Sequence, residues 1–118
     1  MAASQELADA QCNLGICYFE GRGVPQDYTQ AAEYYREAAN QGYAEAQYNL
    51  ATCCYDGFGV SQDYVEAYKW LHLIPLGKRF GLLECAYKLQ AEIAAKLKPE
   101  EIAEALRRAD SFRRGVGR

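Results

Sequence analysis

Residues 8–42 read ADAQCNLGICYFEGRGVPQDYTQAAEYYREAANQG, and residues 44–78 read AEAQYNLATCCYDGFGVSQDYVEAYKWLHLIPLGK. Thirteen of these 35 positions are identical when the two stretches are compared at an offset of 36 residues. Self-similarity at such a period is typical of solenoids, which are built from small supersecondary units. One unit cannot bury its own apolar face, so we expect the two units to stack side by side.

Each copy predicts two helices joined by a loop that contains glycine. In the first copy Gly21 and Gly23 suit the left-handed conformation that ends a helix, and Asp27 then serves as the N-cap of the second helix. Gly57, Gly59 and Asp63 repeat these features in the second copy. Pro75 should end the fourth helix early, which leaves residues 75–81 as a connector.

Apolar residues at helical spacing predict the buried side of each helix. The stripe predicted for the first helix consists of Leu7, Ala10, Leu14, Cys17 and Tyr18. Leu14 is placed at its centre, and Leu50 is expected to be buried in the same way one unit later. The second helix is expected to turn inward Tyr28, Ala31, Ala32, Tyr35, Ala38 and Ala39.

The last part of the chain lacks the glycine loop and predicts a terminal pair of helices, residues 82–112, that caps the second repeat. The fifth helix is expected to bury Leu82, Leu83, Ala86, Leu89, Ile93, Ala94 and Leu97. The sixth begins at Pro99 and is expected to bury Ile102, Ala105, Leu106, Ala109 and Phe112. The sequence therefore predicts one all-α domain over residues 1–118, an α/α superhelix of about six antiparallel helices.

Composition limits the classes of partner. The chain is half hydrophobic and a quarter charged, which is typical of a globular protein, and no apolar run is long enough to span a bilayer. The sequence start has no basic and apolar leader, so we expect a cytoplasmic protein with no membrane partner; a periplasmic or secreted location stays open if a leader is processed.

The charges are divided unevenly along the chain. Residues 1–76 carry 3 Lys/Arg and 10 Asp/Glu, a net charge of −7, whereas residues 77–118 carry 10 Lys/Arg and 6 Asp/Glu, a net charge of +4. The overall charge of −3 argues against a nucleic-acid partner. Attraction between the unlike ends of two copies leaves a homodimer open.

The residue types needed for catalysis do not form a recognisable motif. The five cysteines have neither a partner at metal-ligand spacing nor a nearby histidine, and His72 is the single histidine. We therefore expect reduced cysteines that pack in the core, no catalytic residue, no metal and no cofactor. A disulfide remains an alternative, as does a small hydrolase that uses a cysteine or a carboxylate.

The repeated pattern AxAQxNLG, followed by GxGVxQD and AAxQG, resembles the Sel-one-like repeat family, which is related to the tetratricopeptide repeats. In the first copy the match is carried by Ala10, Gln11, Asn13, Leu14, Gly15, Tyr18, Gly21, Gly23, Val24, Asp27, Ala31, Tyr35, Ala38, Ala39 and Gly42. In the second copy it is carried by Ala46, Gln47, Asn49, Leu50, Gly57, Gly59, Val60, Asp63, Ala67 and Trp70. Ala51 and Cys54 depart from the pattern where the first copy has Gly15 and Tyr18. The resemblance implies a superhelix that scaffolds protein complexes.

The resemblance also implies a concave surface lined by the first helix of each unit. With Leu14 at the core centre, the residues predicted to face a partner are Asp9, Cys12, Asn13, Ile16, Phe19, Glu45, Tyr48, Asn49, Thr52 and Tyr55. Aromatic side chains beside acids suit a protein or peptide with apolar anchors and a basic residue. Three alternatives stay open: the aromatics pack against the neighbouring unit, the asparagines bond backbone between helices, and the acids form a solvated face.

Overall fold

The computed structural model describes residues 2–74 and 80–115, and their side chains over 6–74 and 81–115. The helices in these ranges are α1 (Ala2–Glu20), α2 (Tyr28–Asn40), α3 (Ala44–Asp56), α4 (Tyr64–Leu73), α5 (Phe80–Ala94) and α6 (Pro99–Arg113), with no strand among the described residues. The predicted all-α class is confirmed. Within the same ranges, no helix combines the length and apolar character needed to cross a bilayer.

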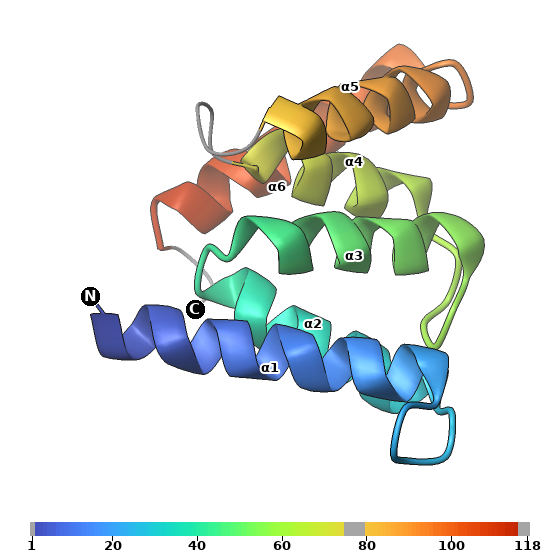
Figure 1. Ribbon diagram of the computed structural model, residues 1–118. Coiled ribbons are helices and arrows are strands. Elements are labelled where there is room, and N and C mark those ends of the chain that lie inside the picture. Colours follow the sequence, from blue (N-terminus) through green and yellow to red (C-terminus); the bar gives the residue numbers. More distant parts are fainter. Residues whose placement is uncertain (1, 75–79, 116–118) are drawn as a thin grey trace.

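The helices form two layers. α1, α3 and α5 lie in front in Figure 1, and α2, α4 and α6 lie behind them. Along the first four helices, each helix packs against the next one in the sequence. This is the α/α superhelical arrangement that the repeat predicted.

The predicted helix boundaries are largely confirmed. Asp27 Oδ1 accepts a hydrogen bond from the Gln30 backbone N–H at 3.1 Å, and Asp63 does the same for Glu66 at 3.1 Å. α4 ends at Leu73, three residues short of the length of α2. Pro75 lies outside the described residues. The predicted connector 75–81 was wrong at its end, because α5 already begins at Phe80. A glycine at position 81 is tolerated there, since the N–H groups of the first helical turn make no intrahelical hydrogen bond.

The two repeats stack through α2 and α3. Leu50 is fully buried, and Gln47 Nε2 donates to the Ala39 carbonyl at 3.2 Å. The loop before α4 joins this interface, since a Cβ on Gly59 would lie only 2.1 Å from the Tyr28 carbonyl oxygen. The adjacent Phe58 ring lies 4.8 Å from the Tyr28 ring. The second repeat therefore docks on the first through both a helix and a loop.

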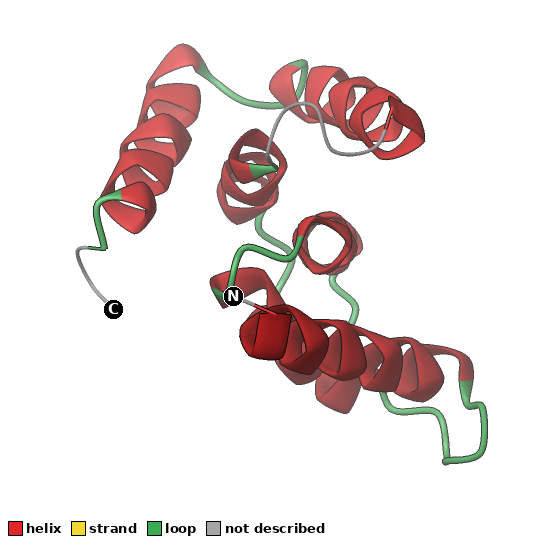
Figure 2. Ribbon diagram, turned by 60° about the vertical axis from the view of Figure 1, so that its left-hand side comes forward, coloured by secondary structure: helices red, strands yellow, loops and turns green. Residues whose placement is uncertain are grey.

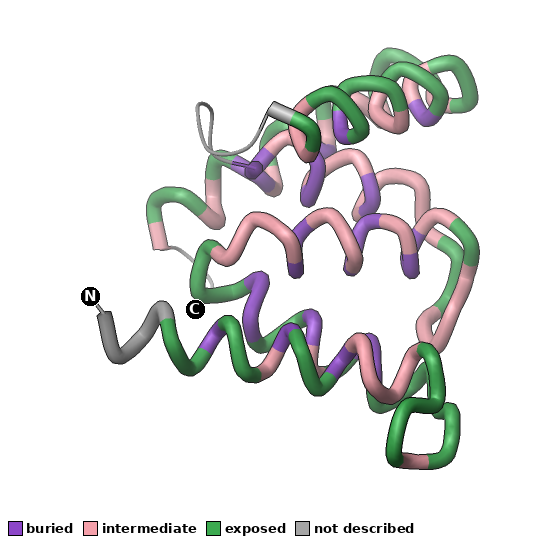
Figure 3. The backbone as a smooth tube through the Cα atoms, in the orientation of Figure 1, coloured by how far each residue is buried: buried purple, intermediate pink, exposed green. Residues whose placement is uncertain are grey.

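The predicted buried face of α1 was wrong. Leu14 is 44% exposed and Leu7 is 54% exposed, whereas Leu50 is completely buried. Figure 3 shows the difference: exposed residues recur along α1, whereas α3 is mostly half-buried or buried. α3 packs on α2 of the preceding repeat as well as on α4, whereas among the described helices α1 packs mainly on α2. The face that α1 buries instead carries Ala8, Cys12 and Gly15.

The C-terminal helices do not form a hairpin packed on itself. α5 and α6 each contact α4 and have little contact with one another (Figure 2). Ala105 and Ala109 of α6 are fully buried, as predicted, but Leu106 is 38% exposed, so its predicted burial was wrong. Since α6 touches mainly α4, only one side of it is covered.

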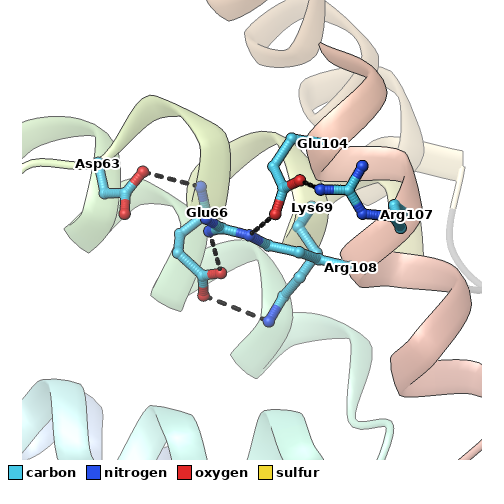
Figure 4. Close-up of polar contacts among 6 residues, drawn as sticks. All are labelled: Asp63, Glu66, Lys69, Glu104, Arg107 and Arg108. Carbon is cyan, nitrogen blue, oxygen red and sulfur yellow. Dashed lines mark hydrogen bonds and ion pairs between the residues drawn. The ribbon is translucent and has the colours of Figure 1, made fainter. Parts of the chain in front are cut away.

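Aromatic and charged contacts together dock α6 on α4. The Trp70 ring meets the Phe112 ring edge-on at 5.3 Å, and Lys69 Nζ lies 4.1 Å above the Trp70 ring. Arg108 then bridges the two helices, with Nη1 3.0 Å from Glu66 Oε1 and Nε 2.8 Å from Glu104 Oε2 (Figure 4). Lys69 Nζ also lies 3.2 Å from Glu66 Oε2.

Gly59→Ala should destabilise the protein more than Gly23→Ala. The two glycines have φ values of 74° and 73°, so each substitution carries a left-handed strain of about 1–2 kcal/mol. Only at Gly59 does the new methyl group also meet the α2 backbone, which adds about 1–3 kcal/mol. Urea denaturation of both variants measures the difference, and equal losses would contradict the docking of the second loop on α2.

Arg108→Ala should lower the free energy of unfolding by about 1 kcal/mol, a value already reduced for partial solvent exposure. Arg107→Ala is the matched control, because Arg107 lies on the same helix with a 72% exposed side chain, and within the described ranges its ion pair is with Glu104 of that helix. Its effect should stay within about 0.5 kcal/mol. The measurement is the urea midpoint at unchanged m-value; equal effects would remove the interhelical role of Arg108.

Candidate functional site

Three side chains meet where α1 passes the start of α3. The Tyr43 hydroxyl donates to Asp9 Oδ1 at 2.5 Å and lies 3.4 Å from Glu45 Oε1. We name Asp9, Tyr43 and Glu45 the acidic seam. The hydrogen bond to Asp9 raises the pKa of Tyr43, with burial a smaller cause, so the hydroxyl stays a donor at neutral pH. The seam thus holds two carboxylates close together on the molecular surface.

The middle of the predicted site is only partly at the surface. Cys12 is 2% exposed, so its prediction as a partner-binding residue was wrong: the face of α1 that carries it turns toward the core. Asn49 Nδ2 lies 3.9 Å from Cys12 Sγ, a weak contact that ties α3 to α1. Asn13 is exposed and makes no hydrogen bond among the described residues. Neither asparagine bonds backbone there, contrary to the alternative left open.

The two predicted aromatic anchors are engaged inside the protein. Phe19 packs on Tyr28 at 4.9 Å and edge-on against Phe58 of the second repeat at 5.5 Å. This confirms, for Phe19, the alternative that the aromatics pack against the neighbouring unit. Tyr55 stacks on Tyr64 at 5.3 Å, and its hydroxyl donates to Glu92 Oε2 of α5.

The remaining predicted residues lie along the half-buried surface of α1 and α3. Ile16 packs against the core. Thr52 Oγ1 donates to the Tyr48 carbonyl within α3, at 3.1 Å. Burial raises the pKa of Tyr48, and Cys85 of α5 adds to the effect, so this tyrosine lies on the side of α3 that faces α5. The structure therefore divides the predicted residues between an α1–α3 group and an α3–α5 group.

Two residues of this surface were missed by the sequence analysis. Tyr43 lies between the two repeat copies and has Leu7 as its equivalent, so the repeat gave no signal for it. Glu92 lies on α5, which has no copy elsewhere in the chain. The signal that could have found Tyr43 is its place directly before α3, beside the acidic start of that helix.

The cysteines in the core are poor nucleophiles. Burial raises the pKa of Cys12 to about 11, of Cys53 to about 12 and of Cys54 to about 11. Their thiols are therefore protonated at neutral pH. Because the thiolate is the nucleophilic form, these cysteines are unreactive there. Burial also lowers the pKa of His72, and Arg113 adds to this. Among the described residues, no group of three or more His, Cys, Asp or Glu is placed to hold a metal ion.

A thiol reagent at pH 8 should modify Cys85, which is exposed, quickly, and Cys12, Cys53 and Cys54 only when the protein unfolds. Cys85→Ser is the control that should remove the fastest phase and leave only the slower modification of half-buried Cys17 in the native protein. Because the three buried thiols have raised pKa values, the folded state holds protons that the unfolded state releases near the ordinary value of 9. Stability should therefore be fully present below pH 9 and fall as the pH rises above it. Fast modification of Cys53 in the native protein would contradict the burial of its thiol.

Known proteins share both the repeat and the fold. The family profile of the Sel1 repeat matches residues 8–43 and 44–73. A search of curated proteins gives no match. A protective antigen present in uropathogenic Escherichia coli strains, described as displaying an SLR fold, superposes with a TM-score of 0.82 at 31% identity, over 94% of this chain and 23% of the antigen. A Sel1 repeat protein from Oxalobacter formigenes gives a TM-score of 0.57 at 36% identity, over 62% of this chain and 30% of its own.

This chain thus spans under a third of either structure. The two profile matches together cover more than half of its residues and coincide with the two helix pairs α1–α2 and α3–α4. The chain belongs to the Sel1 repeat family.

Proposed function

We propose that this chain is a non-catalytic interaction module that binds a protein or peptide segment carrying a Lys or Arg at the acidic seam. Sel1 repeat proteins are generally protein–protein interaction modules. The observation that supports this binding site is the Tyr43 hydroxyl, which holds Asp9 of the first repeat beside Glu45 of the second. A cation placed there would meet the Asp9 carboxylate of the first repeat, with Glu45 of the second repeat on the other side of the tyrosine hydroxyl.

The geometry favours recognition by a surface that is already formed before the partner binds. Asp9 lies on α1 and Glu45 on α3, and both positions are fixed by the stacking of the repeats rather than by the arriving partner. A rigid surface reduces the ordering cost of binding. Asp9 makes no ion pair within the part of the chain that the structure describes, so its charge is available to a cation.

The charges alone would bind weakly. An exposed ion pair contributes roughly 0.2–1 kcal/mol, so a useful affinity needs further contacts. Half-buried Asn49 lies on the α1–α3 side of α3 and half-buried Tyr48 on the α3–α5 side, so the Tyr48 ring supplies apolar area and Asn49 a hydrogen-bonding group. The partner we propose is therefore an extended or helical segment with one basic residue at the seam and apolar residues along α3.

The hydrolase alternative has less support. It would use Cys53 or a carboxylate, yet the thiol is buried with a raised pKa. The two carboxylates of the seam share a tyrosine donor. Binding of a basic residue needs neither a nucleophile nor a general base, and the seam offers negative charge to pair with it.

Selection of a random displayed peptide library on the immobilised chain tests the proposal. Selected peptides should be enriched in Lys and Arg, and the tightest of them should bind Asp9→Asn about 2–5-fold more weakly, the effect expected of one exposed charge pair. Tyr43→Phe, which frees Asp9 from its hydrogen bond, should alter affinity as well. Added salt should weaken binding to the wild-type chain, since exposed charges are screened.

Glu33→Gln is the matched control, because Glu33 is an exposed carboxylate on α2, in the other layer of helices. It removes the same charge from the protein and should leave affinity unchanged. Selected peptides without basic residues, or equal losses from Asp9→Asn and Glu33→Gln, would contradict binding at the seam.

A further inference from the structure

Three identical residues are buried on the first helix of the second repeat and are exposed or half-buried on the first helix of the first repeat. The set on α3 is Ala46, Leu50 and Cys53, which are 0%, 0% and 1% exposed. The identical residues at the equivalent positions of α1 are Ala10, Leu14 and Cys17. Here Leu14 is 44% exposed, Ala10 is exposed and Cys17 is half-buried. α1 therefore carries the side chains of a repeat-stacking interface on an uncovered surface.

The loop that follows α1 differs from its counterpart after α3 in the same way. Gly59 lies against the backbone of α2, because that loop belongs to the interface with the preceding repeat. The equivalent Gly23 has the same left-handed backbone, yet a Cβ built there would meet nothing within 4 Å. We call the surface formed by Leu7, Ala10, Leu14, Cys17 and this loop the head.

The other end of the stack has a complementary exposure. The eighth residue of α2 is Tyr35 and that of α4 is Leu71, and both are 4% exposed; Tyr35 lies against Gly15 of α1, the first helix of its own repeat. The eighth residue of α6 is Leu106, which is 38% exposed. Tyr87 on α5 is 54% exposed. We call Tyr87 and Leu106 the tail.

Apolar exposure and charge both separate the two ends. The exposed large hydrophobic residues within the described ranges are Leu7, Leu14, Tyr28, Tyr87 and Leu106, all of them in the first repeat or the last two helices. Residues 1–42 carry 2 Lys/Arg and 6 Asp/Glu, a net charge of −4, against +4 for residues 77–118. α1 and the α5–α6 pair lie at opposite ends of the stack (Figure 1).

We infer that the head of one copy docks on the tail of a second copy and so continues the superhelix from chain to chain. The head repeats the α3 surface that already stacks on a second-layer helix, and the tail offers the uncovered side of α6, the last second-layer helix, with Leu106 exposed on it. Opposite net charge favours this pairing over head-to-head or tail-to-tail contact. Each docked pair keeps one free head and one free tail, so assembly continues with concentration.

A mixing experiment with light scattering tests the inference. The wild-type mass should rise above one chain as concentration increases, and it should fall when salt is added. Leu14→Glu blocks the head and Leu106→Glu blocks the tail, so each variant alone should stay a single chain. An equimolar mixture should form a dimer and stop there, because one variant supplies the free tail and the other the free head. Ser61→Glu is the control, with the same kind of charge at an exposed loop position in the middle of the array, and it should assemble like wild type.

Each other result overturns the pairing. A wild-type mass of one chain at all concentrations rejects self-association. Dimers of Leu106→Glu alone would indicate head-to-head contact, and dimers of Leu14→Glu alone would indicate tail-to-tail contact. Circular dichroism melts of both variants confirm that the fold is retained, and the exposed starting positions make large losses unexpected.

Discussion

The structure depends on the close approach of the second repeat to α2. Leu50 and Cys53 supply the apolar contact, and Gly59 lets the loop backbone come against the Tyr28 carbonyl. One helix pair of this size buries too little apolar surface to be stable alone, so stacking supplies a large share of the driving force. Everything that lies across the repeats, including the Phe19–Phe58 contact and the acidic seam, follows from this approach.

Within each repeat, a second constraint sets how closely the two helices of a pair approach. A Cβ on Gly15 would lie 2.6 Å from the Tyr35 ring, so the large aromatic ring of α2 needs a glycine opposite it. In the second repeat the equivalent pair is Ala51 and Leu71, which are 0% and 4% exposed. A larger residue on one helix is thus matched by a smaller one on the other. The Gly15/Ala51 and Tyr35/Leu71 differences between the copies therefore compensate one another in volume, and the fold is kept.

Most of the fold could be predicted from the sequence, because its signals are local. Asp27 and Asp63 cap helices through neighbouring backbone, and the alanines of α2 occupy one helical face whatever lies beyond. The burial of Leu14 could not be predicted from its repeat equivalence, since identical residues are buried only if a neighbour covers them. The same reason explains Leu106. Of the candidate site, Asp9 and Glu45 were predicted, but Tyr43, which joins them, belongs to neither copy and became visible only when α1 and α3 were placed side by side.

The acidic seam is therefore a property of the stack rather than of a repeat. Tyr43 stands at the junction of α2 and α3, so any shift of the second repeat moves its hydroxyl relative to Asp9 on α1. Asp9 belongs to the first repeat and Glu45 to the second, and Tyr43 lies at the junction between them, so neither repeat alone contains the whole seam. Binding at the seam would hence stabilise the stacked arrangement, because a ligand that prefers a surface present only in one state shifts the equilibrium toward that state. Because binding and stacking are coupled in this way, selection for binding would preserve the stacking of the repeats more than any single side chain.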